Sequence, residues 1–327
     1  MITDESYANE YEHYEEQFNP LRSDRKARRT RRLEARHTPR KPPSQILTEI
    51  AEPTGLEGGF NTTYKPGRFE QGWLLSSLSS FYDQGLVSDV LAQIKGGKEA
   101  NVYRCEAHPS TGMSLLAAKV YRPRMFRVLR NDSMYRQGRE ILTADGSVVK
   151  KSDHRIMRAI DKKTAFGVQV QHTSWLAHEY VALQRLYEVG GAVPRPIATS
   201  DNAILMSYCG DEHMGAPSLN RVALEQDEAR LLLGEVLRNV ELMLQLDLIH
   251  GDLSPYNILY WAGEITLIDF PQVTDCHTNS RAYSILQRDI RRVCDYFARQ
   301  GVQCDAADIT DELWSRCGQM SLHELAK

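Results

Sequence analysis

The sequence lacks long apolar runs and closely spaced cysteine pairs. Its apolar stretches fall short of the ~18–20 residues that a membrane-spanning helix needs, so we expect no membrane partner. None of the six cysteines stands in a CxxC pair, and free thiols are typical of a reducing compartment. The first sixteen residues are acidic and polar, unlike a secretory signal. These absences predict a cytoplasmic location.

A strong overall charge is also missing, because the 327 residues carry a net charge of only −3. The charge is unevenly spread, since residues 1–21 hold six acids and no Lys or Arg, whereas residues 22–41 hold ten Lys or Arg against two acids. Residues 1–70 show no sustained hydrophobic periodicity, which predicts a disordered extension. The basic run 22–41 fits either a solvated tail or binding of RNA or a ribosomal particle through phosphate contacts.

Hydrophobic patterning predicts ordered structure from about residue 71 onward. We expect strands at 90–94, 102–105, 115–121, near 197 and at 204–208, a hairpin at 258–268, and helices at 73–85, 175–189, 225–246, 282–299 and 308–317. Residues 122–174 are polar, basic and irregular, which predicts a flexible insertion. Strands followed by helices favour an α+β fold, with a β-rich N-lobe at 71–208 and a helical C-lobe at 209–327.

The segment LIHGDLSPYNILYWAGEITLIDFPQ, residues 248–272, holds polar side chains at fixed offsets. Asp252 follows the predicted helix, Asn257 lies five residues later, and Asp269 lies twelve residues beyond Asn257. A turn at 262–263 would bring Asn257 and Asp269 together, and their oxygens suit Mg²⁺ or Mn²⁺. This pattern is typical of phosphoryl transfer from ATP, with Asp252 orienting the attacking hydroxyl and the other two holding metal against the phosphates.

Residues 94–103, IKGGKEANVY, are the candidate phosphate loop between two predicted strands. With Val102 in register, only Gly97 falls on a glycine position of the usual GxGxxG kinase loop. The loop is not a Walker A motif either, because Glu99 follows Gly-Lys. Backbone amides can still bind phosphate here, and Lys98 adds charge. An ordinary hairpin is the alternative interpretation.

Lys119 lies in a predicted strand among apolar neighbours, and Glu179 lies on the following predicted helix. A buried lysine usually needs a partner of opposite charge. We therefore expect a Lys119–Glu179 ion pair that positions the α- and β-phosphates of ATP. The alternatives are a lysine that reaches out to solvent and a solvated glutamate.

Taken together, these segments resemble the RIO atypical protein kinases. The matching segments are GKEANVY at 97–103, KVYR at 119–122, HGDLSPYN at 250–257, IDFPQ at 268–272 and RDIRRVCDYF at 288–297. The resemblance runs from about residue 85 to 300 and implies a two-lobed protein-kinase-like fold with a truncated C-lobe. It implies an ATP- and metal-dependent serine/threonine kinase with Asp252 as catalytic residue and with Asn257 and Asp269 as metal ligands.

Several finer expectations follow from this resemblance. The family carries a flexible loop where this chain has its long insertion, and the absence of a winged-helix pattern near the N-terminus resembles the branches without that domain. In that family the metal aspartate can itself become phosphorylated, which would make Asp269 part of an ATPase-like cycle. Autophosphorylation is expected, and ribosome assembly is the setting that the family suggests.

The adenine-binding hinge is expected at residues 206–209, directly after the strand that ends near Leu205. Met206 would lie at the back of the pocket, and the backbone of Tyr208 would meet the adenine. An ordinary buried strand end is the alternative.

Two other functions stay open at this stage. Small-molecule kinases of the aminoglycoside or choline type share an HGDxxxxN…IDF arrangement, so residues 250–270 alone do not exclude them. An ATP-gated binding module without a protein substrate is the other alternative, because no helical platform for peptides follows Asp269 in this sequence.

Overall fold

The structure, a computed structural model, describes residues 62–97, 99–122, 139–143, 146–150, 152–162 and 164–324, the last eight by their backbone alone. The chain divides into two compact units. The described part of the first is Lys65–Ser76, and the second holds Thr62–Tyr64 and the residues from Ser77 onward. Lys98, the basic run 22–41 and the predicted extension up to residue 61 lie outside the described residues. The lobe boundaries at 71, 208 and 209 stay predictions.

The first described helix, α3 (Arg68–Asp83), begins five residues before the predicted start at Trp73. Gly85 follows it with a φ of +63°, which is a conformation that glycine adopts without strain, and its amide donates to the Tyr82 carbonyl oxygen at 2.9 Å. The predicted helix end at this glycine is thus confirmed.

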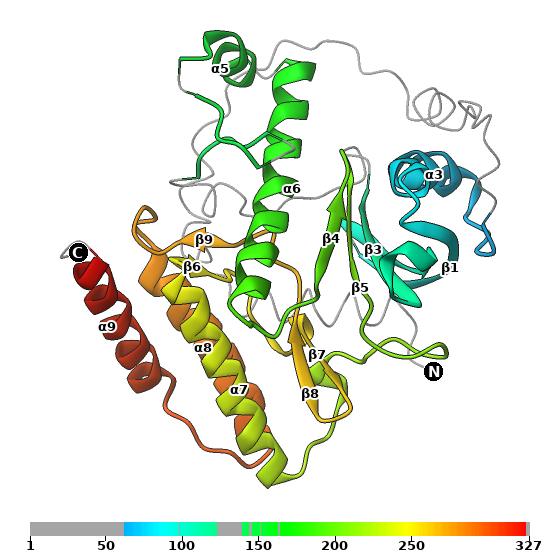
Figure 1. Cartoon of the computed structure of the whole chain (residues 1–327). Helices are drawn as coiled ribbons and strands as arrows, with labels where there is room; N and C mark the ends of the chain where they lie inside the picture. Colours follow the sequence, from blue (N-terminus) through cyan, green and yellow to red (C-terminus); the bar gives the residue numbers. More distant parts are fainter. Residues whose placement is uncertain are drawn as a thin grey trace, which may run out of the picture. The chain divides into compact units, whose positions relative to one another are not determined.

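A five-stranded antiparallel sheet forms the first half of the second unit (Figure 1). Its spatial order is β1-β2-β3-β5-β4, so β3 lies at the centre. The strands are β1 (Val87–Gly96), β2 (Ala100–Ala107), β3 (Leu115–Tyr121), β4 (Pro196–Thr199) and β5 (Ala203–Ser207), with a 3₁₀ turn η2 (Pro109–Thr111) between β2 and β3. Six of the seven β3 residues are buried, as the apolar run LLAAKVY predicts.

The prediction that residues 122–174 are irregular is wrong for their second half, whereas the described residues 139–143 and 146–150 form no helix or strand beyond an isolated bridge. The second half contains helix α5 (His154–Asp161) and the first turns of α6 (Ala165–Glu188), which begins ten residues before the predicted start at residue 175. The Asp153 carboxylate caps α5 and the Thr164 hydroxyl caps α6, so local side chains satisfy the first helical amides. Helix α5 is only eight residues long, and residues 168–171 of α6 alternate apolar and polar side chains as a strand does, so apolar periodicity did not reveal these helices. Whether the insertion is flexible stays a prediction.

Three helices, α7 (Gln226–Gln245), α8 (Ala282–Arg299) and α9 (Ala306–Glu324), lie side by side after the sheet (Figure 1). Two small sheets lie in sequence between α7 and α8. In the first, β6 (Leu248–Ile249) pairs with β9 (Thr274–Asp275), and in the second, β7 (Ile258–Trp261) pairs with β8 (Glu264–Leu267). Two 3₁₀ turns, η4 (Leu219–Arg221) and η5 (Pro255–Asn257), complete this half. The predicted α+β class and the predicted order of strands before helices are confirmed.

No helix among the described residues is apolar and long enough to cross a membrane.

Candidate active site

Lys119 and Glu179 form a buried ion pair between the sheet and helix α6. The Lys119 ammonium lies 2.6 Å from the Glu179 carboxylate, and the two side chains are only 10% and 1% exposed. The register of β3 places Lys119 opposite Val102 on β2 and opposite Ile204 on β5, so a paired strand flanks it on each side. The predicted pairing of these residues is present in the structure.

Asp269 is the second carboxylate on the same ammonium. Its Oδ1 atom lies 2.5 Å from the Lys119 Nζ, and its side chain is 38% exposed. Burial opposes the charge on Lys119, but Asp269 and Glu179 outweigh burial and raise its pKa well above the usual value. The ammonium in turn outweighs desolvation at Asp269 and lowers the pKa of that carboxyl group. Both groups are thus held in their charged forms.

The hairpin of β7 and β8 brings Asn257 next to the Asp269 loop. Its turn uses Ala262 and Gly263, which have φ values of +51° and +88°. Ile258 pairs with Leu267, and the Ile268 amide donates to the Asn257 carbonyl oxygen at 3.0 Å. Asp269 itself has a φ of +73°, a conformation that Asp tolerates better than most residues. The predicted turn therefore brings the two chain segments that carry the expected metal ligands side by side.

Asp252 lies in the loop after β6, where two side chains hold its carboxylate. The Arg292 guanidinium on α8 donates to Oδ1 at 2.6 Å, and the Asn257 amide donates to Oδ2 at 3.2 Å and to the Asp252 carbonyl oxygen at 2.9 Å. Burial alone would lower the pKa of Arg292, but Asp252 outweighs it and raises the pKa. The carboxylate of Asp252 is thus fixed in one orientation.

Only glycine fits at position 251, in the loop after β6. Gly251 has a φ of +83°, and a Cβ atom there would lie 2.3 Å from the Gln272 carbonyl oxygen. Its amide donates to the Asp289 carboxylate at 2.9 Å, and Arg288 donates to its carbonyl oxygen. The His250 ring also contacts the Ile268 carbonyl oxygen at 3.1 Å. The two loops that carry Asp252 and Asp269 are therefore packed directly on each other.

The expected phosphate loop connects β1 to β2, the strand that pairs with β3. The Gly97 amide donates to the Asn101 side chain at 3.3 Å, and a Cβ atom at Gly97 would lie 2.7 Å from the Ala100 carbonyl oxygen. Val102 is half-buried and pairs with Lys119. Burial, followed by the charge of Asp269, raises the pKa of Glu99 to about 8. The loop thus presents Glu99 to the same charge cluster as Lys119 and Asp269.

The expected hinge follows the end of β5. Met206 is 8% exposed and pairs with Ala117 of β3 and Pro196 of β4. Tyr208 lies just beyond the strand, and burial raises the pKa of its hydroxyl group. Met206 thus lies on the strand next to that of Lys119 and Tyr208 directly follows this strand, and their contact with adenine stays a prediction.

Comparison with known proteins identifies the domain. The RIO domain family matches residues 102–310, which is more than half of the chain. The chain belongs to the RIO domain family. The predicted RIO-type fold, with a five-stranded N-lobe sheet and a helical C-lobe, is therefore confirmed.

Named relatives of this RIO domain are kinases. The serine/threonine-protein kinase RIO1 of Chaetomium thermophilum is 32% identical over 231 residues, 67% of this chain and 41% of the relative. The RIO-type serine/threonine-protein kinase Rio1 of Haloferax volcanii is 30% identical over 215 residues, 65% of this chain and 64% of the relative. The human serine/threonine-protein kinase RIO1 is 30% identical over 220 residues, 67% of this chain and 35% of the relative. The match thus spans less than two thirds of each relative.

Two residues of this RIO site had no predicted role in the sequence. The Tyr121 hydroxyl donates to Glu179, and its ring meets Trp175 edge to face with a centroid distance of 4.8 Å. Tyr121 lies two residues beyond Lys119 on β3, so the alternation of the strand could have placed both on one face. Arg292 lies in the RDIRRVCDYF segment, but that resemblance gave no role to any of its three arginines.

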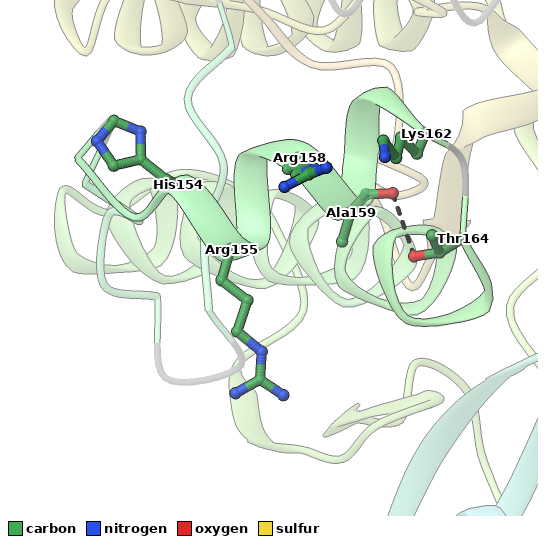
Figure 2. A pocket seen from close by; sticks show the side chains of 6 residues that line it. All are labelled: His154, Arg155, Arg158, Ala159, Lys162 and Thr164. Carbon is green, nitrogen blue, oxygen red and sulfur yellow. Dashed lines mark hydrogen bonds between the residues drawn. The ribbon is translucent and has the colours of Figure 1, made fainter.

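A separate cavity lies away from this site. It has a volume of about 440 Å³ and lies on α5 and at the start of α6 (Figure 2). Its lining residues are His154, Arg155, Arg158, Ala159, Lys162 and Thr164. Figure 2 shows that the cationic side chains of Arg155 and Lys162 point in different directions, so they do not converge on one ligand. This cavity therefore shows no convergent pair of cations, and the Lys119 cluster stays the candidate active site.

Proposed function

We propose that this chain is an ATP- and metal-dependent serine/threonine kinase of the RIO type. The observation that carries the proposal is the Lys119 ammonium, which lies 2.6 Å from Glu179 and 2.5 Å from Asp269. These three residues come from a strand, a helix and a loop that are far apart in sequence. The three RIO relatives named above are serine/threonine kinases, which supports the same reaction class.

Each side chain receives one role in this proposal. Lys119, positioned by Glu179, binds the α- and β-phosphates of ATP. Asn257 and Asp269 hold Mg²⁺ or Mn²⁺, and the part-exposed carboxylate of Asp269 fits this role because hard cations take carboxylate oxygens. The metal, when bound, neutralises charge on the transferred phosphoryl group.

Asp252 orients the hydroxyl group that attacks the γ-phosphate. Its carboxylate is fixed by Arg292 and Asn257, and such positioning is what phosphoryl transfer requires of a protein. Because Arg292 already neutralises Asp252, we infer that Asp252 acts mainly by accepting a hydrogen bond from the hydroxyl group.

The remaining predicted residues complete the nucleotide site in this proposal. Gly97, Glu99 and Val102 form the phosphate loop together with Lys98. Met206 and the backbone of Tyr208 form the adenine pocket. The protein substrate includes the chain itself, and a ribosomal particle or RNA is the proposed partner of residues 22–41. The free cysteines of the described part support a reducing, cytoplasmic compartment.

Autophosphorylation with labelled ATP and Mg²⁺ tests the proposal. Asp252→Ala should lower incorporation of label by about 10²-fold or more, because an oriented hydroxyl is lost. Asp227→Ala is the matched control, since Asp227 lies in the first turn of α7 with a side chain that is 96% exposed. Equal labelling of the wild type and Asp252→Ala would overturn the role of Asp252.

An ATP-gated binding module is the second candidate. The ion pair between Arg292 and Asp252 favours it, because the Oδ1 atom of Asp252 already accepts a hydrogen bond from Arg292. In that case ATP hydrolysis would persist without label on any protein, and loss of Lys119 rather than Asp252 would abolish the cellular function. Rapid turnover of a small alcohol instead would point to a small-molecule kinase.

A further inference from the structure

A second cluster of potential ligands lies at the open end of the β6–β9 pair, outside the proposed ATP site. Asp247 precedes β6, and Cys276 and His277 follow β9. The Cys276 amide donates to the Asp247 carbonyl oxygen at 3.0 Å, so the backbone continues the pairing to this position. Asp247 has a φ of +62°, which is uncommon outside glycine. The fold thus brings an oxygen, a sulfur and a nitrogen ligand together from two chain segments.

The three ligand atoms are close enough to surround one ion. They all lie within 4.8 Å of one another. The Asp247 Oδ1 atom lies 2.8 Å from the His277 Nε2 atom and 4.0 Å from the Cys276 Sγ atom. In a tetrahedral zinc site with bonds of about 2.0–2.3 Å, neighbouring ligand atoms are roughly 3.3–3.8 Å apart. Changes of about 0.5–1.5 Å in these distances, made by side-chain rotation, therefore reach that geometry.

We propose that Asp247, Cys276 and His277 bind Zn²⁺, with water as the fourth ligand. Thiolate and imidazole ligands favour zinc over Mg²⁺, which prefers oxygen alone. Cys276 is 4% exposed, whereas the side chains of Asp247 and His277 are 51% and 45% exposed. The buried sulfur therefore anchors the ion, and the exposed pair leaves its outer side to solvent. Binding releases the thiol proton to solvent as the Zn–S bond forms.

The site is chemically distinct from the proposed nucleotide centre. Asn257 and Asp269 offer only oxygen ligands, whereas the β6–β9 cluster offers sulfur and nitrogen. Its position has a structural consequence, because β6 leads into the Asp252 loop and β9 follows the Asp269 loop. Zinc would join the two segments at one point and restrict their separation.

Titration of the full-length, reduced, metal-free chain with Co²⁺ tests the proposal. No nucleotide is added, and the readout is the thiolate-to-cobalt absorption, which an oxygen-only site does not produce. We expect saturation at one equivalent and displacement by Zn²⁺. Cys276→Ser should abolish the band, whereas Cys304→Ser and Asp269→Asn should keep it.

A second variant covers the case in which Cys276→Ser does not fold. His277→Gln changes a side chain that is 45% exposed, and it should weaken Co²⁺ binding at least about tenfold. Absence of a saturable band in the wild type overturns the proposal. So does an unchanged band in folded Cys276→Ser, or an unchanged affinity in His277→Gln. None of these outcomes depends on kinase activity, so the proposed function is tested separately.

Discussion

At the scale of single residues, the position of Asp252 depends on Arg292. Both side chains are buried, at 9% and 4% exposure, and each is the other's counter-charge. Arg292→Ala leaves the Asp252 carboxylate buried without its cation, which we expect to cost about 3–5 kcal/mol of unfolding free energy. Urea denaturation measures this loss, and labelled ATP measures the accompanying fall in autophosphorylation.

The neighbouring arginine provides the control for this prediction. Arg291 lies on the same helix but is exposed, so Arg291→Ala should change the unfolding free energy by no more than about 0.5 kcal/mol. Equal effects of the two substitutions would contradict the importance of the Arg292–Asp252 pair.

Glu99 gives a prediction about pH. Burial and Asp269 raise its pKa from 4.5 to about 8, so the folded chain keeps a proton that the unfolded chain loses. Stability from this group therefore falls as the pH rises between about 4.5 and 8, by at most about 1.4 kcal/mol per pH unit. Glu99→Gln should flatten this dependence and stabilise the nucleotide-free chain at pH 8.

Thermal unfolding across this pH range measures the effect. Glu264→Gln is the control, because Glu264 is an exposed residue of β8. A pH profile that is the same in Glu99→Gln and wild type would show that Glu99 titrates normally.

Sequence reasoning found the Lys119–Glu179 pair because a lysine in an apolar strand demands a nearby acid. It could not find Arg292, since Arg288, Arg291 and Arg292 lie close together on α8 and only the orientation of the folded helix decides which one reaches Asp252. The contact between Lys119 and Asp269 was also not predicted, because it depends on the left-handed backbone at Asp269.

At the scale of elements, the loop between β6 and η5 depends on Gly251. Gly251→Ala would place a Cβ atom 2.3 Å from the Gln272 carbonyl oxygen at a φ of +83°. We expect a loss of at least about 1–3 kcal/mol of stability, together with reduced autophosphorylation, because the loops of Asp252 and Asp269 must separate.

Another glycine supplies the contrast. Gly234 lies on an exposed position of α7 with open space around its Cα atom, so Gly234→Ala should stabilise the chain by about 0.5–1 kcal/mol. Chemical denaturation measures both variants, and a stable, active Gly251→Ala would contradict the close packing of the two loops.

The elements themselves were predictable to different degrees. Strand β3 has the predicted bounds because its apolar run is continuous. The start of α6 was missed because Gly167 disfavours a helix and residues 168–171 alternate apolar and polar side chains, whereas in the structure the Thr164 hydroxyl caps the first turn. At Gly167 a Cβ atom would lie 2.1 Å from the Ala159 carbonyl oxygen, so close packing on α5 explains this glycine.

At the scale of the whole molecule, the basic run 22–41 yields a prediction that does not depend on the active site. Its ten Lys or Arg residues should bind RNA through phosphate contacts, so deleting the run should weaken RNA binding and lower its salt dependence. Filter binding at several salt concentrations measures both effects. Deletion of residues 1–21, which hold six acids, is the control, and unchanged affinity after loss of 22–41 removes the RNA hypothesis.

The side chains of Tyr121, Glu179, Lys119 and Asp269 form one continuous chain of hydrogen bonds and ion pairs. Each side chain pairs with the next one, so substitution of one residue removes a hydrogen-bonding partner from at least one polar neighbour. Selection is therefore expected to act on the four residues together. In an alignment of close relatives, substitutions at the four positions are expected to occur jointly, and a chain that has lost Lys119 is expected to have replaced Glu179 and Tyr121 as well.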